Sequence, residues 1–182
     1  PSANGQIITV THVMAGYVDT LTEIEKLRFD DGEIAVSRDG NDLTFTGSGG
    51  PDSIKIIGSV PVTIKGRDGS DMITGSDGAD TITGGPGDDT IEGGDGSDTV
   101  EFSGDMDDFT FAVAADGTLT VTDVGTGNSL GVDTISGVET LSFNDGDLAV
   151  TTSTGGEVTL TGSSADDVIT LTGSGAGTVY GG

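Results

Sequence analysis

Aspartate residues recur every nine positions in the middle of the sequence. From Gly66 the chain reads GRDGSDMIT, GSDGADTIT, GGPGDDTIE and GGDGSDTVE without a gap. Each unit opens with glycine and has a second glycine at position four, aspartate at position six and an aliphatic residue at position eight. Carboxylates at this spacing, beside glycine carbonyl oxygens that no Cβ obstructs, are suited to binding a hard cation. The pattern therefore predicts a row of metal sites.

Each nonapeptide is expected to form a tight turn followed by a very short strand. Glycine supplies the positive φ angles that a tight turn needs, and the aliphatic residue near the end of the unit points inward. Two units then make one coil of a flattened solenoid, so that alternate units stack. Ile73 would lie over Ile91, and Ile82 over Val100. The predicted fold class is an all-β solenoid.

Stacking also brings the aspartates of alternate units together, at a layer spacing of about 4.8 Å. Asp71 would lie near Asp89, and Asp80 near Asp98. Bare carboxylates this close repel, and a divalent cation removes the repulsion. Calcium accepts oxygen ligands in flexible geometry, whereas magnesium demands a tight octahedron, so calcium is the expected cofactor. Because such sites do not exist in the unfolded chain, calcium binding and folding should be one equilibrium.

The candidate ligands are the acidic and glycine residues of the turns. The carboxylate donors are the position-six aspartates and their counterparts in weaker flanking units, namely Asp71, Asp80, Asp89, Asp98, Asp52, Asp107 and Asp167. The candidate carbonyl donors are Gly66, Gly69, Gly75, Gly78, Gly84, Gly85, Gly87, Gly93, Gly94 and Gly96. At position three, Asp68, Asp77 and Asp95 either donate backbone oxygens or are solvated turn residues. Val62 stands where the unit IGSVPVTIK needs aspartate, which predicts a missing or incomplete site.

The composition excludes several classes of partner. The chain has 31 acidic and 6 basic residues, a net charge of −25 and no cysteine. After Arg67 there are 22 carboxylates and no lysine or arginine, so this part should need an external cation in order to fold. A nucleic-acid partner is excluded because phosphate binding requires excess positive charge. No apolar run approaches the roughly 18 residues of a membrane span, so no direct membrane insertion is expected.

The sequence offers no convincing catalytic group. Residues 127–131 fit the pattern G-x-S-x-G, but His12, the only histidine, precedes them, which is the reverse of the hydrolase order. Ser129 is therefore interpreted as a loop residue and His12 as a strand residue. We expect that the chain is not an enzyme.

The nonapeptides resemble those of the repeats-in-toxin (RTX, haemolysin-type) calcium-binding proteins. The resemblance is strong over residues 66–101 and looser over 47–110. It implies a right-handed parallel β-roll, export by a type I secretion machine, and folding on calcium outside the cell. The expected location is therefore secreted, extracellular or at the cell surface. The stretch from DDFTFAVAADGTLTVTD through VDTISGVETLSFNDGDLAV also resembles the region on the C-terminal side of the repeats in many members.

A second period of roughly 114 residues is visible. Residues 18–36 match residues 132–150 at 10 of 19 positions, and a second alignment places Asp167 over Asp52. The predicted organisation has four segments: a partial, strand-rich module (1–46), a calcium-binding β-roll (47–110), a β-hairpin and strand segment that repeats residues 4–36 (111–150), and the start of a second, incomplete β-roll (151–182). The flanking segments are expected to be hairpin-like or sandwich-like.

Two functions remain open from the sequence. The duplication favours a secreted calcium-binding structural module of a bacterial extracellular fibre, adhesin, surface layer or biofilm matrix. The ends, which show no evident cap, suggest assembly with copies of itself in a head-to-tail filament or tandem array. The alternative is the calcium-folding export domain of a type I secreted enzyme, such as a protease or lipase. No adhesion target is indicated.

Overall fold

The computed structural model describes residues 8–12, 17–21, 26–28, 33–39, 42–126, 129–163, 169–173 and 175–181. Short strands joined by turns make up most of this part of the chain, and one 3₁₀ turn, η1 (Met106–Asp108), interrupts them. The strands are β1 (Ile8–His12), β2 (Tyr17–Leu21), β3 (Lys26–Arg28), β4 (Glu33–Asp39), β5 (Asp42–Thr46), β6 (Ser53–Lys55), β7 (Val62–Lys65), β8 (Met72–Thr74), β9 (Thr81–Thr83), β10 (Thr90–Glu92), β11 (Thr99–Glu101), β12 (Phe109–Val113), β13 (Leu119–Asp123), β14 (Val132–Ser136), β15 (Thr140–Phe143), β16 (Gly146–Thr152), β17 (Val158–Gly162), β18 (Leu171–Gly173) and β19 (Gly177–Tyr180). In these ranges no helix has the length and apolar character needed to cross a bilayer.

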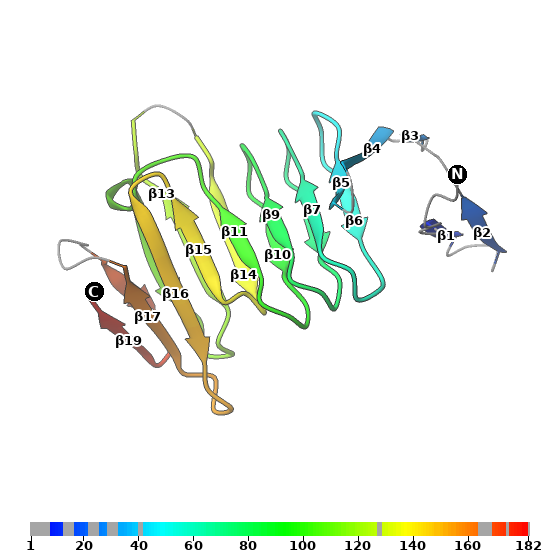
Figure 1. Cartoon of the computed structure of the whole chain (residues 1–182). Helices are drawn as coiled ribbons and strands as arrows, with labels where there is room; N and C mark the ends of the chain where they lie inside the picture. The colour runs from blue at the N-terminus through cyan, green and yellow to red at the C-terminus, as the bar shows by residue number, and fades with distance from the viewer. Residues whose placement is uncertain are drawn as a thin grey trace.

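The middle of the chain is a parallel β-roll, in which successive strands alternate between two sheets (Figure 1). Strands β6, β8, β10 and β14 stack in a seven-stranded sheet, and β5, β7, β9, β11 and β15 stack in a ten-stranded sheet. Neighbours within each of these two stacks pair in parallel. Ile73 pairs with Ile91, and Ile82 with Val100, as the repeat predicts. The fold is therefore all-β and built around a β-roll.

A single ladder of aliphatic side chains from each sheet fills the roll. The residues at position eight are all at most 3% exposed: Ile54, Ile73, Ile91, Ile135, Ile64, Ile82, Val100 and Leu141. Burying a side chain of this size contributes about 1.5–3 kcal/mol. Each nonapeptide contributes only one such residue, while its six turn residues must also be ordered at a cost of roughly 1–2 kcal/mol each. The apolar core alone is therefore too thin to hold the turns.

An inserted β-hairpin interrupts the roll after β11. Strands β12 and β13 pair antiparallel around Asp116 and Gly117, where Gly117 has a φ of 86°, as the sequence predicts for a hairpin turn. Strand β13 then pairs antiparallel with β14, and β14 pairs in parallel with β10. A cluster of aromatic rings, with centroid separations of 5.1 to 6.1 Å, packs at the insertion: Phe102, Phe109, Phe111 and Phe143.

The roll therefore continues beyond residue 110, where the sequence prediction ended it. Strands β14 and β15 lie after the hairpin and form the next coil, on top of β10 and β11. The insertion breaks the nine-residue period, so this coil is not contiguous with the repeats in the sequence. The segment predicted as 111–150 is thus in part hairpin and in part roll.

The longer repeat is visible in the registers of the strand pairs. Lys26 lies opposite Ala35 in the pair β3–β4, and Thr140 lies opposite Ala149 in the pair β15–β16, 114 residues later at both positions. The parallel pair β17–β19 likewise repeats the parallel pair β5–β7. The two copies therefore share their strand pairing as well as their sequence.

Candidate metal centre

The residues at position six of each turn form two rows along the roll. The first row follows the seven-stranded sheet and contains, layer by layer, Asp52, Asp71, Asp89 and Asp133. The second row follows the ten-stranded sheet and contains Val62, Asp80, Asp98 and Glu139. The rows form because equivalent strands of successive coils pair in register. The turn residues that precede these strands are therefore stacked as well.

After the first layer, each carboxylate uses one oxygen to hold the layer before it. In the first row, the N–H groups of Asp52 and Asp71 donate to Oδ1 of Asp71 and Asp89, each at 2.8 Å. The N–H of Asp89 donates to Asp133 Oδ1 at 2.9 Å. The second row repeats the pattern, with the Asp80 N–H donating to Asp98 Oδ1 at 2.8 Å. These bonds fix the orientation of each carboxylate and involve only one of its two oxygens.

Three of these second oxygens are buried without a hydrogen-bond partner. They are Oδ2 of Asp71, Asp89 and Asp98, in residues that are 2%, 1% and 0% exposed. A desolvated, unpaired carboxylate oxygen costs several kcal/mol, as an order of magnitude, unless it is neutralised. A cation beside each oxygen would remove this cost.

The opening glycines mark where such a cation fits. A Cβ added at Gly66 would collide with Asp71 Oδ2 and with the carbonyl oxygen of Gly84 in the next layer. A Cβ at Gly75 would similarly meet the carbonyl oxygen of Gly93. A carboxylate oxygen and a carbonyl oxygen from successive layers thus converge on a point that only glycine leaves open. Since no group of three or more acidic, histidine or cysteine side chains gathers in the described ranges, carbonyl oxygens must complete each site, and such mixed oxygen donors fit calcium.

Serine side chains replace the cation's role where the rows begin. The Ser48 hydroxyl donates to Asp52 Oδ2 at 3.0 Å and the Ser76 hydroxyl to Asp80 Oδ1 at 3.1 Å, and the backbone N–H of each serine donates to Oδ2 of the same aspartate. In the layer before Asp80, the equivalent position is held by Val62, which is buried and has no side-chain oxygen. This arrangement supports the prediction that the site at Val62 is missing or incomplete.

Burial raises the pKa of four carboxyl groups in the rows, those of Asp71, Asp89, Asp98 and Asp133. Desolvation is the largest cause, and it raises the pKa of Asp89 and Asp98 to about 6 and that of Asp133 to about 7. The hydrogen bond from the preceding layer lowers each pKa, while the neighbouring carboxylate in the row raises it further. Without a metal these groups therefore bind protons near neutral pH, and a cation must compete with those protons.

The predicted site residues divide into four groups. The position-six aspartates of the four central repeats and Asp52 lie in the rows. Asp68, Asp77 and Asp95 are exposed, which is compatible with either of their two interpretations. The structure does not bring Asp107 together with the other predicted ligands, because the chain leaves the roll at η1 and the exposed Asp107 side chain lies outside both rows. Asp167 lies outside the described residues.

The glycines divide by their position in the turn. The opening glycines, Gly66, Gly75, Gly84 and Gly93, lie against the carboxylates of their own turns. The others are needed where the backbones of successive layers meet: Gly69, Gly78, Gly85, Gly87, Gly94 and Gly96. A Cβ on Gly87, for example, would collide with the carbonyl oxygen of Gly69. In this second group the missing Cβ lets the layers pack closely, and calcium binding by the carbonyl oxygens of these residues stays a prediction.

Sequence reasoning missed Asp133 and Glu139. The signal for Asp133 is present, since residues 131–135, GVDTI, match positions four to eight of the repeat. Glu139 starts ETLS, which matches positions six to nine with glutamate in place of aspartate. Both were overlooked because the inserted hairpin separates them from the contiguous block.

Comparison with known families agrees with this geometry. Residues 65–100 match the family model of the RTX calcium-binding nonapeptide repeat, in four copies. A search among curated proteins found no match. The roll and its two carboxylate rows define a calcium-binding β-roll protein. Residues 65–100 are thus RTX nonapeptide repeats, which bind calcium, and proteins that carry such repeats are typically secreted.

Arg67 occupies a turn position better suited to glycine. Its φ is 83°, whereas Gly85 and Gly94 hold the same position in later turns with φ of 117° and 115°. We expect Arg67→Gly to stabilise the calcium-bound roll by about 1 kcal/mol, because a non-glycine residue is strained there. Urea denaturation in saturating calcium measures the change.

Ser76→Gly is the matched control for this prediction. Ser76 holds the same turn position without a positive φ, and it donates hydrogen bonds to Asp80. Its replacement should lower the free energy of unfolding. If both variants were destabilised equally, backbone strain at Arg67 would be ruled out.

Proposed function

We propose that the chain is a structural module of a bacterial extracellular fibre, adhesin, surface layer or biofilm matrix, and that it has no catalytic role. The observation that carries the proposal is the recurrence of the same strand registers 114 residues apart. A solenoid built from such copies can be lengthened without a new fold, because each layer contacts only its neighbours. A load-carrying or spacing role needs that property, whereas catalysis does not.

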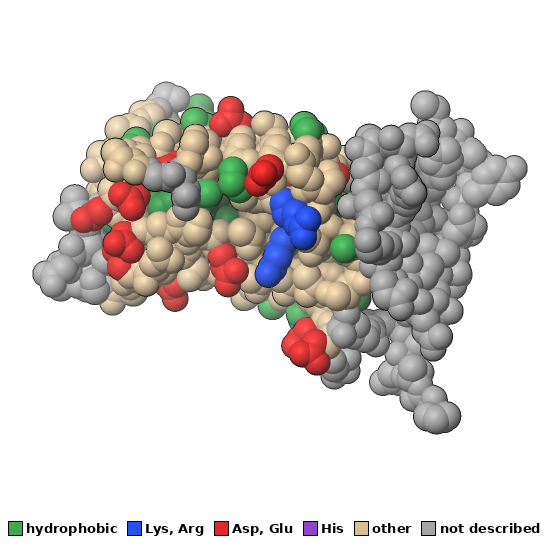
Figure 2. All heavy atoms as spheres, turned by 90° about the horizontal axis from the view of Figure 1, so that it is seen from above, with side chains coloured by type: hydrophobic (Ala, Val, Ile, Leu, Met, Phe, Trp, Pro, Cys, Tyr) green, Lys and Arg blue, Asp and Glu red, His purple; other side chains and the backbone are tan. Residues whose placement is uncertain are grey.

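The charge distribution makes calcium the switch for this module. On the face that Figure 2 shows, acidic side chains of the described residues are scattered, while basic ones gather in one patch. The described basic side chains, Lys55, Lys65 and Arg67, all lie in the first layers of the roll. Self-repulsion keeps the chain extended where calcium is scarce, which suits export. Calcium sites of extracellular modules have dissociation constants of about 10⁻⁴ to 10⁻³ M, so folding would follow outside the cell.

Copies of the same chain are the partners that we propose for this module, in a tandem array or a head-to-tail filament. The solenoid supports this because its parallel ladders present the same repeating turn in every layer, and heterologous contacts between such layers propagate. A nucleic-acid partner does not fit the net charge of −25.

Electron microscopy of the purified chain with calcium and with excess EGTA tests the proposal. We expect filaments or end-to-end oligomers in calcium and none in EGTA, with magnesium as a control that does not restore them. Monodisperse particles under both conditions would rule out self-assembly. Calcium-dependent folding without assembly would instead favour an export domain of a secreted enzyme.

A further inference from the structure

Both carboxylate rows continue past the nonapeptide block and across the inserted hairpin. The Asp89 N–H donates to Asp133 Oδ1 at 2.9 Å, and the Asp98 N–H donates to Glu139 Oε2 at 2.9 Å. Backbone bonds accompany them, since the Thr134 N–H donates to the Asp89 carbonyl oxygen at 2.8 Å. These are the same contacts that join one nonapeptide layer to the next.

Two of the three unpartnered carboxylate oxygens lie in this last layer of the block. They are Oδ2 of Asp89 and of Asp98, and both residues are almost completely buried. A Cβ at Gly93 would collide with Asp98 Oδ2 and with the carbonyl oxygen of Gly137, which belongs to the coil after the hairpin. At Gly75, the equivalent oxygens are those of Asp80 and Gly93, and both residues belong to the nonapeptide block. The open oxygen of Asp98 is therefore aimed at a position that the next coil completes.

Glutamate at position 139 fits the shorter turn in which it lies. Asp98 follows its opening glycine, Gly93, by five positions, whereas Glu139 follows Gly137 by two. Three turn residues are thus missing before Glu139. The additional methylene group of glutamate lets its carboxylate reach the Asp98 N–H across the shortened turn.

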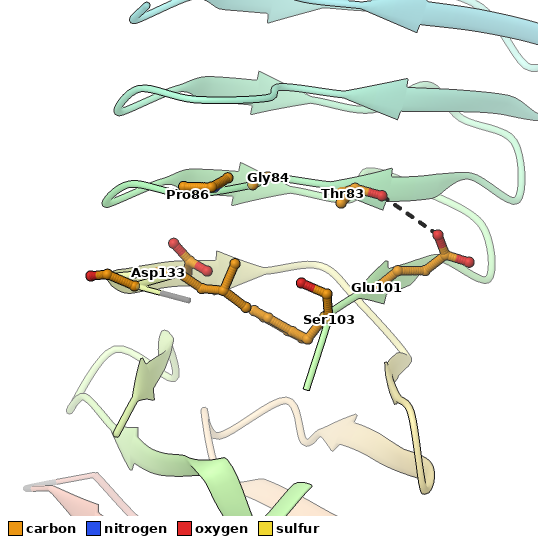
Figure 3. Close-up of a pocket in the computed structure, with 10 residues that line it drawn as sticks. Thr83, Gly84, Pro86, Glu101, Ser103 and Asp133 are labelled. Atoms are coloured by element: carbon orange, nitrogen blue, oxygen red, sulfur yellow. Dashed lines mark hydrogen bonds between the residues drawn. The ribbon is translucent and has the colours of Figure 1, made fainter. Parts of the chain in front are cut away.

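Asp133 follows Asp89 in the first row. It is 3% exposed and lines a cavity between its own layer and the layer of Gly84 and Pro86. Its carboxylate points toward that layer (Figure 3). The Val132 N–H beside it donates to Asp88 Oδ1 at 2.9 Å, which places a further acidic side chain at the same junction.

We propose that two further calcium ions bind at this junction, one between Asp89 and Asp133 and one between Asp98 and Glu139. The family model ends at residue 100, so neither Asp133 nor Glu139 belongs to the recognised repeats. The two ions join the block to the coil beyond the hairpin, and they hold the base of the inserted segment. Calcium would thereby order the hairpin although the hairpin itself supplies no ligand.

The number of calcium ions bound per chain tests this proposal. Native mass spectrometry of the full chain in saturating calcium would compare the wild type with Asp133→Asn, Glu139→Gln and the double variant. We expect each single variant to bind one ion fewer and the double variant two fewer. Glu157→Gln is the control, because Glu157 is exposed, lies just before β17 away from the junction, and accepts a hydrogen bond from the Thr178 hydroxyl at 3.4 Å, so the ion count of this variant should equal that of the wild type.

Wild-type ion counts in both single variants would overturn the proposal. If Asp133→Asn failed to fold, Glu139→Gln would decide, because its side chain is exposed and lies outside the apolar core. Loss of one ion from that variant would support the junction sites, and a full count would contradict them. A wild-type chain that bound no calcium at all would refute the calcium role of the repeats as well.

Discussion

Asp89→Ala is expected to raise the calcium concentration for half-maximal folding at least about tenfold, whereas Asp116→Ala should change it by less than about twofold. Asp89 Oδ1 accepts the hydrogen bond of the Asp71 N–H, and its Oδ2 has no protein partner. The alanine variant leaves a buried N–H unpaired, at about 1–3 kcal/mol, and also removes a metal ligand. A tenfold change corresponds to only about 1.4 kcal/mol.

Asp116 is a suitable control because it carries the same charge in a different setting. It is exposed in the hairpin turn, where its Oδ1 accepts a hydrogen bond from the Thr118 N–H at 3.1 Å. Circular dichroism during a calcium titration gives both midpoints. Equal midpoints for the two variants would show that the rows do not bind the ions that drive folding.

The pH dependence of stability should reverse when calcium is added. In the ion-free roll, the pKa values of Asp89 and Asp98 are raised to about 6 and that of Asp133 to about 7, all from 3.8. Groups with a raised pKa in the folded state stabilise it at low pH, and this contribution is lost as the pH rises through the folded-state pKa. Without calcium, the roll should therefore be more stable near pH 4 to 5 than above pH 7.

With calcium the same carboxyl groups must be ionised in order to bind the ion. Acidification from pH 7 to 5 should then weaken calcium binding, because protons and calcium compete for the same oxygens. Circular dichroism in EGTA, which reports the folded fraction, and calcium titrations, each at pH 5 and pH 7.5, measure the two trends. If both trends had the same sign, the raised pKa values would not belong to the calcium ligands.

The contiguous repeats allowed the centre of the fold to be predicted from sequence. Four units in register fix the stacking of Ile73 over Ile91 and the row that joins Asp71 to Asp89, because a period of nine leaves one way to superpose the turns. The turn glycines point to the same arrangement, since their positions require close approach of the backbone. Local pattern and tertiary structure agree in this region.

Beyond the block, the local pattern was not sufficient. Asp107 keeps the spacing of the repeat, yet the aromatic cluster directs the chain into the hairpin at that point, and its side chain is exposed. Asp133 and Glu139 lie in the rows although a hairpin separates them from the block. Which strand follows β11 in the roll depends on long-range pairing that a nine-residue period does not encode.

The most direct test of the account is small-angle X-ray scattering of the chain at pH 7.5, in excess EGTA and in saturating calcium. The account predicts an expanded chain in EGTA, with a radius of gyration approaching about 45 Å as for an unfolded chain of this length, and a large contraction when calcium is added. An identical compact profile under both conditions would contradict the claim that calcium holds the layers of the roll together.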